Sequence, residues 1–389
     1  MLPLPSCDAQ ALQQTLLAQM EQACQRQGGK IPFADFMRMA LYQPGTGYYS
    51  AGLAKIGEAG DFVTAPMISA LYSQTLANQC QQIIKLLGRG GCIMELGAGT
   101  GRMACDIMHH LATQQALPEQ YYILEVSADL KARQYEFLQE HCQAHFARFV
   151  WLDRLPQTPF TGIILANEVI DALPCHLFKI SEQHKILEGL VELNHQQLTL
   201  TYAKPITTGL EKAIKDLQDR LEIPLAKGYT SEIHLSLNAF IASLSACLEK
   251  GVMLFIDYGF PSHEYYHPSR HMGTLMCHYR HHAHSDPLQY IGMQDITSHV
   301  DFTALALAGI NHGLELAGFT NQGAFLINNG ITGLAENTTS DTQRLAFSQQ
   351  IQKLTHPHEM GELFKVMALS KNFDEPLAGF AAFDQRHRL

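Results

Sequence analysis

CIMELGAGTGR, residues 92–102, carries the strongest structural signal in this 389-residue chain. A short apolar run ends at Glu95, and glycines then alternate at Gly97, Gly99 and Gly101 before a helix-like segment. Glycine lets the backbone approach a ligand closely, and the first turn of a helix offers N–H groups without a partner inside the helix. The stretch therefore predicts a nucleotide-binding turn between a strand and a helix of an α/β fold.

The spacing of these glycines separates two kinds of nucleotide. The dinucleotide fingerprint requires glycine at the first, third and sixth positions of its loop, and the sixth position counted from Gly97 is Arg102. S-adenosylmethionine (SAM) fits better, because it has no phosphates and because the acidic Glu95 suits a cationic ligand. A second strand, at 121–125, ends in Glu125, whose carboxylate can accept hydrogen bonds from both ribose hydroxyls. NAD proteins share this acid, so a NAD-dependent oxidoreductase stays open as an alternative.

The composition is that of a globular protein without general affinity for nucleic acid. Hydrophobic residues make up 46% of the chain and charged residues 16%, and the formal net charge is −10. Negative charge opposes binding to phosphate backbones, because that binding is largely electrostatic. The nine cysteines include no C-x-x-C pair, which favours reduced, mostly buried thiols. We see no basic N-terminal leader and no apolar stretch long enough to span a bilayer, so we expect a cytoplasmic protein that is not in a membrane.

Strand and helix patterns alternate from residue 92 onward. This alternation predicts a mostly parallel sheet with helices on both faces. The predicted strands lie at 92–96, 121–125, 147–151, 161–166 and 251–257, and the predicted helices at 101–113, 128–143, 169–173 and 231–249. Apolar runs within 314–327 and 362–369 are predicted as a final antiparallel pair of strands.

Two intervals interrupt the alternation and suggest insertions. Residues 176–204 alternate like a β-hairpin or meander, and residues 260–300 look like a long loop rich in His, Tyr and Gly. Long loops inside compact domains are often functional. We predict an N-terminal helical region with a cofactor-covering loop over 1–88, followed by an α/β domain over 89–389 with insertions at about 176–230 and 260–300.

The end of strand 161–166 supplies two carboxylates. Ligands of open α/β sheets bind outside the carboxyl ends of the strands, where Asn167, Glu168 and Asp171 follow. A helical turn over 169–173 would place the two acids on one side, and paired carboxylates can hold a guanidinium by charge-assisted hydrogen bonds. A helix start that favours acidic residues for its dipole is the alternative interpretation.

Two further segments offer candidate contacts to a ligand. The loop 57–64 would fold over a cofactor with Asp61 and Thr64 as polar contacts, or else be an ordinary surface turn. Asp257 and Tyr258 close a buried strand, and both would project into the cleft outside the strand ends. A turn after a core strand is the alternative for this pair.

Histidines concentrate between residues 263 and 284. Their spacing matches no zinc signature and no cysteine pair accompanies them, so we predict no metal site there and expect solvated loop histidines. His299 and Asp301 follow this loop as candidate substrate contacts, or as the cap of a helix that begins at Phe302. The chain has no G-x-S-x-G elbow, so a hydrolase is disfavoured.

Taken together, six motifs make the chain resemble the MidA family of class I SAM-dependent methyltransferases. The motifs occur in this order: GDFVTAP at 60–66, ELGAGTG at 95–101, LEVSADL at 124–130, ANEVIDALP at 166–174, IDYG at 256–259 and HVDFTAL at 299–305. The likeness spans roughly residues 30–370, and the family includes the mitochondrial arginine methyltransferase required for assembly of respiratory complex I. The resemblance implies a Rossmann-like sheet of about seven strands, SAM as cofactor and a protein arginine as substrate. Met67 departs from the family's acid at that position, which is the best support for a non-catalytic SAM-binding assembly factor as an alternative.

The strand-end geometry and the resemblance together predict residue roles. Glu125 is expected to bind the ribose, with Val126 against the adenine. The predicted cofactor contacts are Gly60, Asp61, Thr64, Glu95, Gly97, Gly99, Glu125, Val126 and Asn167. Glu168 is the first candidate for holding and deprotonating an acceptor guanidinium, and Asp171 is the second. The residues expected to line the acceptor side are Asp257, Tyr258, His299 and Asp301.

Overall fold

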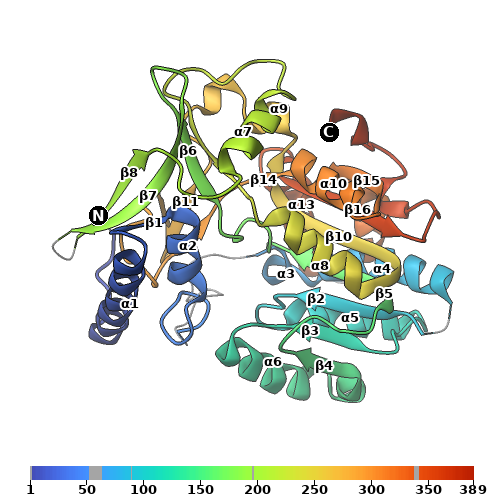
Figure 1. Ribbon diagram of the computed structural model, residues 1–389. Helices are drawn as coiled ribbons and strands as arrows, with labels where there is room; N and C mark the ends of the chain where they lie inside the picture. The colour runs from blue at the N-terminus through green and yellow to red at the C-terminus, as the bar shows by residue number, and fades with distance from the viewer. Residues whose placement is uncertain (1, 52–63, 89, 195–196, 337–340) are drawn as a thin grey trace. The chain divides into compact units, whose positions relative to one another are not determined.

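The computed structural model describes residues 2–51, 64–88, 90–194, 197–336 and 341–389. The chain divides into two compact units, which are drawn in Figure 1 and described separately below. Unit 1 comprises residues 1–62, 171–237 and 260–301, and unit 2 comprises residues 63–170, 238–259 and 302–389. The segments expected as insertions, 176–230 and 260–300, therefore fall in unit 1, whereas 64–88 falls in unit 2.

Seven strands of the described chain form the main path of the sheet in unit 2, in the order β15-β16-β10-β5-β2-β3-β4. These strands are β2 (Cys92–Leu96), β3 (Tyr121–Leu124), β4 (Phe149–Leu152), β5 (Phe160–Asn167), β10 (Leu248–Phe260), β15 (Glu315–Asn321) and β16 (Phe364–Lys371). Strands β4, β3, β2, β5 and β10 pair in parallel, and β16 pairs antiparallel with both β10 and β15. An antiparallel strand thus separates β10 from β15, unlike the dinucleotide-binding order 3-2-1-4-5-6, which has no such strand.

Helices pack against this sheet and bury it. The seven residues 251–257 of β10 are all buried, so both faces of the sheet are covered at this strand. Figure 1 shows β2, β3 and β4 in successive positions, with α6 next to them at that edge. The helical elements of unit 2 are α3 (Ala65–Ile68), α4 (Ala70–Leu87), α5 (Arg102–Thr113), α6 (Ala128–His141), η1 (Gln143–Arg148), α8 (Leu237–Cys247), α10 (Phe302–Asn311), α11 (Gln322–Asn328), α12 (Ile331–Glu336), α13 (Asp341–Thr355), α14 (Met360–Leu363), η3 (Ala378–Phe380) and η4 (Arg386–Arg388).

Unit 1 contains two small sheets with short helices. Its five-stranded sheet has the order β1-β7-β6-β9 with β8 paired to β7, and its three-stranded sheet has the order β12-β11-β13. The strands of these sheets are β1 (Lys30–Pro32), β6 (His176–Ile180), β7 (Ile186–Asn194), β8 (Gln197–Ala203), β9 (Thr230–Ile233), β11 (Met276–Tyr279), β12 (His282–His284) and β13 (Asp295–Thr297), and the short strand β14 (Val300–Asp301) belongs to neither of them. The helices are α1 (Cys7–Arg26), α2 (Phe33–Tyr42), α7 (Leu210–Gln218), α9 (Ser262–Tyr265) and η2 (Pro268–Arg270). Helices α1 and α2 pack with the sheets around one apolar core of this unit.

The mostly parallel sheet, the meander at 176–204 and the final antiparallel pair of strands are confirmed. Two predictions are wrong. The interval 260–300 is not a structureless loop, because its polar runs form three strands only three or four residues long. The predicted helix 231–249 begins later, since its first residues pair with β6 as strand β9. No helix within the described part of the chain is long and apolar enough to cross a bilayer.

Candidate functional site

The carboxyl ends of four parallel strands bring three predicted cofactor residues and one predicted acceptor-side residue to one edge of unit 2. In the register of the sheet, β2 ends level with β3 and β5, and β10 continues beside the end of β5. Gly97 follows β2, Glu125 follows β3, Asn167 ends β5 and Asp257 lies near the end of β10. Four segments far apart in the sequence therefore meet where ligands of open α/β sheets bind.

The glycine turn after β2 needs its glycines. Gly97 has a φ of 64° and its N–H donates to the carbonyl oxygen of Leu124 at 3.0 Å, which ties the turn to the end of β3. Gly101 has a φ of 82° and is the N-cap residue of α5, where a Cβ would lie 3.5 Å from Leu138 of α6. Residues with a Cβ rarely adopt such positive φ values. The turn therefore needs glycine at both positions, and Gly97 leaves its backbone exposed.

Glu95 is a buried carboxyl under this turn. Its side chain is 1% exposed, and Tyr121 Oη donates a hydrogen bond to Glu95 Oε2 at 2.7 Å. Burial raises the pKa of Glu95 to about 7, the Tyr121 hydrogen bond lowers it, and nearby Glu125 raises it further. Glu95 therefore changes charge close to neutral pH in the absence of a cationic partner.

Glu125 is held by the helix that follows it. Its Oε1 accepts a hydrogen bond from the backbone N–H of Ser127 at 2.9 Å, and its Oε2 accepts one from Gln134 Nε2 at 2.9 Å. The adjacent Val126 leaves 69% of its surface exposed, so an apolar face lies open beside the carboxylate. A fixed acid next to an exposed apolar side chain can accommodate a ribose and the base attached to it.

A relay of hydrogen bonds fixes the predicted catalytic acid. Tyr72 of α4 donates its hydroxyl hydrogen to Asn167 Oδ1 at 2.5 Å, and Asn167 Nδ2 donates to Glu168 Oε1 at 3.2 Å. Burial, followed by the negative charges of Glu168, Asp257 and Glu95, raises the pKa of Tyr72 well above its ordinary value, so Tyr72 remains a donor. Glu168 itself has a φ of 53°, a left-handed conformation that costs about 1–2 kcal/mol for a residue with a Cβ. Strain at such a position is typical of functional sites.

Asp257 supports the turn that carries Glu168. Its Oδ2 accepts a hydrogen bond from the N–H of Ile170 at 3.0 Å, and its Oδ1 accepts one from the N–H of Tyr258 at 2.9 Å. The Tyr258 ring packs edge-on against Phe364, with ring centroids 5.5 Å apart.

The predicted helix 169–173 is wrong, because the backbone turns here without helical hydrogen bonds. Glu168 and Asp171 therefore do not share a helical face, and they belong to different units.

The predicted residues of unit 1 lie among aromatic and polar partners. The carbonyl oxygen of Asp171 accepts a hydrogen bond from the N–H of Ser298 at 3.0 Å, which places Asp171 next to the segment that carries His299. The His299 ring stacks on Phe260 with centroids 5.3 Å apart, and burial lowers the pKa of His299 to about 4. His299 is therefore a neutral imidazole at physiological pH. Among the described residues of unit 1, Asp171 and the segment of His299 are thus held next to each other.

Asp301, which was predicted to line the acceptor side, accepts a hydrogen bond from another residue of unit 1. The hydroxyl group of Ser262 lies 2.7 Å from each carboxylate oxygen of Asp301. Asp301 is also buried, with 6% of its surface exposed. This arrangement is typical of an acid that fixes a turn.

The remaining predicted cofactor contacts precede α3 in the sequence. Gly60 and Asp61 lie outside the described residues. Thr64 directly precedes α3, in which Ala65 is buried and Met67 half-buried.

Sequence reasoning missed three buried polar residues that hold the site together: Tyr72, Tyr121 and Gln134. Gln134 had a visible signal, because it lies between Leu130 and Leu138 on the apolar face of a predicted helix. A polar residue on such a face must find partners, and the partners of Gln134 are Glu125 and the glycine turn. The two tyrosines had no such signal, since aromatic residues are common in apolar runs.

Comparisons with known proteins agree with this geometry. The sequence model of a family described as "Putative S-adenosyl-L-methionine-dependent methyltransferase" matches residues 75–320, more than half of the chain. A protein from Burkholderia thailandensis, whose crystal structure contains S-adenosyl-homocysteine, is 41% identical over 100% of both chains with a TM-score of 0.93. A second crystal structure from this organism, of a native protein, is 40% identical over 100% of both chains with a TM-score of 0.91. The cofactor class is therefore SAM, and the NAD alternative is wrong.

Curated relatives extend the likeness to named enzymes. Protein arginine methyltransferase NDUFAF7, mitochondrial, from Danio rerio is 26% identical over 92% of this chain and 90% of its own length. The NDUFAF7 homolog of Drosophila melanogaster is 27% identical over 91% of this chain and 86% of its own length. These names contradict the cytoplasmic localisation expected from the sequence, because the relatives are mitochondrial. The matched family, the strand order and the ordered motifs agree: the chain belongs to the MidA family of class I SAM-dependent methyltransferases.

Proposed function

We propose that this methyltransferase transfers the methyl group of SAM to an arginine side chain of a protein. The printed names of the relatives from Danio rerio and Drosophila melanogaster support this substrate class. The observation that carries the proposal is the fixed carboxylate of Glu168, held by Asn167 and Tyr72 at the edge where the cofactor residues meet. A guanidinium is the side-chain cation that a carboxylate recognises best through paired hydrogen bonds.

The residues at this edge fit a cationic nucleoside with an amino-acid tail. Gly97 and Gly99 supply a turn with open backbone, and we propose that Glu95 below them binds the cationic methionine end. Glu125 is proposed to accept hydrogen bonds from the ribose, and Val126 to contact the adenine. Asn167 is proposed as a further cofactor contact, and so are Gly60, Asp61 and Thr64 from the loop before α3. When bound, SAM supplies an electrophilic methyl group on a sulfonium.

The chemical task of the protein is to hold the acceptor nitrogen and remove its proton. The pKa of a guanidinium lies above about 12, so the neutral nucleophile is scarce in water. Glu168 is proposed to hold the guanidinium by its carboxylate and to accept a proton as the nitrogen becomes a methylated product. Orientation of the nucleophile and exclusion of water supply the rest of the rate enhancement. Asp171 is the second candidate for the same role.

The proposed acceptor contacts differ in their present hydrogen bonds. Tyr258 and His299 carry aromatic rings that can pack against an extended side chain, and His299 is neutral. Asp257 and Asp301 already bind groups of the protein, so we assign them to positioning the turn of Glu168 and the segment of Ser262. This assignment refines the expectation that all four side chains touch the substrate.

Labelled SAM and a lysate that lacks the endogenous protein test the proposal. The expected result is label on an arginine of one or a few proteins, identified by mass spectrometry after incubation with purified enzyme. The Glu168→Gln variant should bind SAM normally and lose labelling, because the amide cannot accept the proton. Label on another residue type, or on a small molecule, would contradict the arginine assignment.

A further inference from the structure

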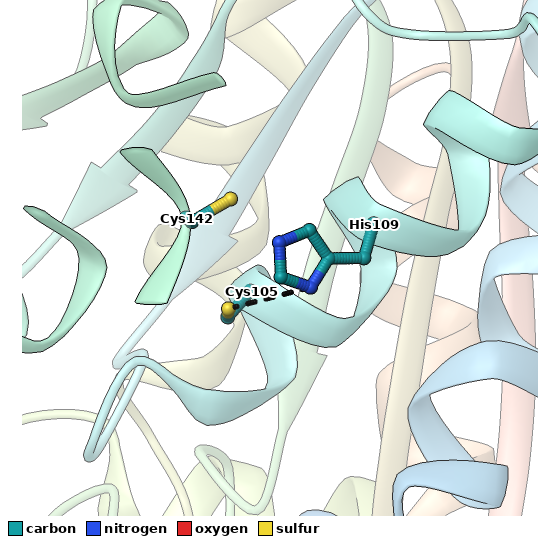
Figure 2. Close-up of side chains that lie close together, drawn as sticks. All are labelled: Cys105, His109 and Cys142. Atoms are coloured by element: carbon teal, nitrogen blue, oxygen red, sulfur yellow. Dashed lines mark hydrogen bonds between the residues drawn. The ribbon is translucent and has the colours of Figure 1, made fainter. Parts of the chain in front are cut away.

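Three potential metal ligands converge on the flank of helix α5, apart from the proposed active site. The ligand atoms of Cys105, His109 and Cys142 all lie within 4.8 Å of one another, and Cys105 Sγ is 3.9 Å from His109 Nδ1. Figure 2 shows the three side chains pointing toward one another, with the His109 ring directed between the two sulfur atoms. All three residues belong to unit 2, so one compact unit of the chain contains the whole group.

The fold builds this group from two adjacent helices. Cys105 and His109 are four residues apart on α5, which places them on one face of the helix. Cys142 is the C-cap residue of α6, at the end of the helix that packs on Gly101. Both sulfur atoms are on buried residues, whereas His109 is exposed, so an ion has a path from solvent through the imidazole side.

A fourth ligand lies within reach. His145 follows Cys142 by three residues in η1, and its ring centroid is 6.3 Å from that of His109. Two imidazoles on one tetrahedral zinc ion have centroids about 5 Å apart, given Zn–N bonds of about 2.0 Å. The proximity of the two rings makes His145 the candidate for the fourth position of a tetrahedral site.

The donor set and the distances fit zinc. Tetrahedral zinc with Zn–S near 2.3 Å and Zn–N near 2.0 Å requires a sulfur–nitrogen separation of about 3.6 Å and a sulfur–sulfur separation of about 3.8 Å. The observed 3.9 Å between Cys105 Sγ and His109 Nδ1 is close to the first value. Thiolates and imidazoles select zinc over the oxygen-preferring ions calcium and magnesium.

We propose that Cys105, His109 and Cys142, with His145 as the fourth ligand, bind one zinc ion that fastens α5 to the end of α6. The ion would stabilise the two helices next to the proposed cofactor edge, since Gly101 is the N-cap residue of α5 and α6 carries Gln134. Two thiols lose their protons to solvent on binding, so zinc uptake should release protons and weaken in acid. We assign the ion a structural role, because none of its four ligands is among the residues proposed to contact the cofactor or the acceptor.

Zinc titration of the purified full-length protein, kept reduced and freed of metal, tests the site. The expected result is one ion per chain with a rise in Tm, and cobalt substitution should give intense thiolate-to-cobalt charge-transfer absorption. Cys105→Ser, Cys142→Ser and His109→Ala should each weaken zinc binding by more than about 100-fold, since loss of outer-shell partners alone costs roughly 10- to 100-fold. His145→Ala should weaken it by about 10-fold or more.

Matched variants distinguish ligand loss from damage to the fold. Cys247→Ser replaces another buried cysteine of unit 2, and His141→Ala removes an exposed imidazole next to Cys142; both should bind zinc as the wild type does. His109 is exposed, so His109→Ala should keep the metal-free Tm and lose only the zinc-dependent rise. Absence of stoichiometric binding, or wild-type affinity in Cys105→Ser and Cys142→Ser, overturns the site. Unchanged affinity in His145→Ala overturns its place as fourth ligand.

Discussion

Gln134 Nε2 lies 2.9 Å from Glu125 Oε2, so a helix side chain holds the proposed ribose-binding acid in place. The same nitrogen donates to the carbonyl oxygen of Gly99 at 3.0 Å, and Gln134 Oε1 accepts from Trp151 Nε1 at 3.2 Å. The amide is thus fully engaged between the glycine turn, the acid after β3 and the end of β4. One buried side chain couples the two segments expected to hold opposite ends of the cofactor.

Gln134→Leu should damage both stability and cofactor binding. The substitution leaves Glu125 and Trp151 without this partner, which we expect to cost about 2–3 kcal/mol of unfolding free energy. The affinity for S-adenosyl-homocysteine should fall by about 10-fold, because each 1.4 kcal/mol of lost positioning is one decade. Denaturant unfolding and calorimetric titration measure the two effects. Gln139→Leu, on an exposed position of the same helix, should change neither.

The buried carboxyl of Glu95 should make SAM affinity depend on pH. Its pKa is raised to about 7, so the fraction that is ionised, and able to bind an amino group, increases as pH rises through 7. We expect affinity to be about fivefold weaker at pH 6 than at pH 7.5, and to fall again once the amino group of SAM loses its proton near pH 8. Glu95→Gln should bind weakly and lack the rise between pH 6 and 7.5. A wild-type affinity that is flat over this range contradicts the role of Glu95.

The same substitution should stabilise the protein without ligand. A carboxyl whose folded-state pKa is raised contributes stability that is fully present below its unfolded pKa of 4.5 and is lost as pH rises through about 7. Glu95→Gln removes that loss, so its Tm should exceed the wild-type Tm at pH 8, by an amount corresponding to at most about 3 kcal/mol. A rise in Tm with a loss of binding excludes misfolding as the cause of weak binding.

The left-handed backbone of Glu168 predicts that replacing this residue by glycine increases stability and abolishes activity. Glu168→Gly relieves the strain and should raise the unfolding free energy by about 1 kcal/mol while it abolishes methyl transfer. His184, with a φ of 58° on an exposed turn, offers the matched control. His184→Gly should give a similar gain in stability with full activity. Methyl transfer by Glu168→Gly at the wild-type rate removes Glu168 from the mechanism.

Tyr72→Phe tests the relay behind Glu168 without touching the acid. Loss of the hydroxyl leaves Asn167 Oδ1 unpaired and frees the amide to rotate, so Glu168 loses its fixed orientation. We expect kcat to fall by about 10-fold, and the unfolding free energy to fall by about 1–2 kcal/mol. Tyr229→Phe removes a buried tyrosine hydroxyl of unit 1 and should leave kcat unchanged. An equal loss of kcat in both variants would falsify the specific role of Tyr72.

The parts of the fold that could be predicted from the sequence are those with strong local signals. The glycine turn at 97–101 requires positive φ, and the apolar run 252–256 is buried along its whole length, so both can be recognised from the residues themselves. Parallel strands then force Gly97, Glu125 and Asn167 to one edge, because their carboxyl ends meet there. Local sequence patterns, and the rule that ligands bind outside the carboxyl ends of parallel strands, were sufficient to predict that these three residues share one edge of the sheet.

Other features depend on contacts between residues far apart in sequence. Nothing within 169–173 reveals that Asp257, almost ninety residues later, binds the N–H of Ile170 and supports a turn in place of a helix. Cys105 and Cys142 are likewise separated by 37 positions, so no zinc spacing was visible in a scan for short motifs. Three short strands within 260–300 escaped notice because each is too short to show alternation.

The strand order of unit 2 has a consequence for how the chain acquires its structure during translation. Strand β10 pairs on one side with β16, which comes more than one hundred residues later and near the end of the chain. Until residues 364–371 leave the ribosome, the hydrogen-bonding edge of a strand whose central residues 252–256 are all apolar is open to any other extended segment. We therefore expect chaperones to bind the nascent protein. Truncation before β16 should yield aggregates in place of a smaller folded enzyme.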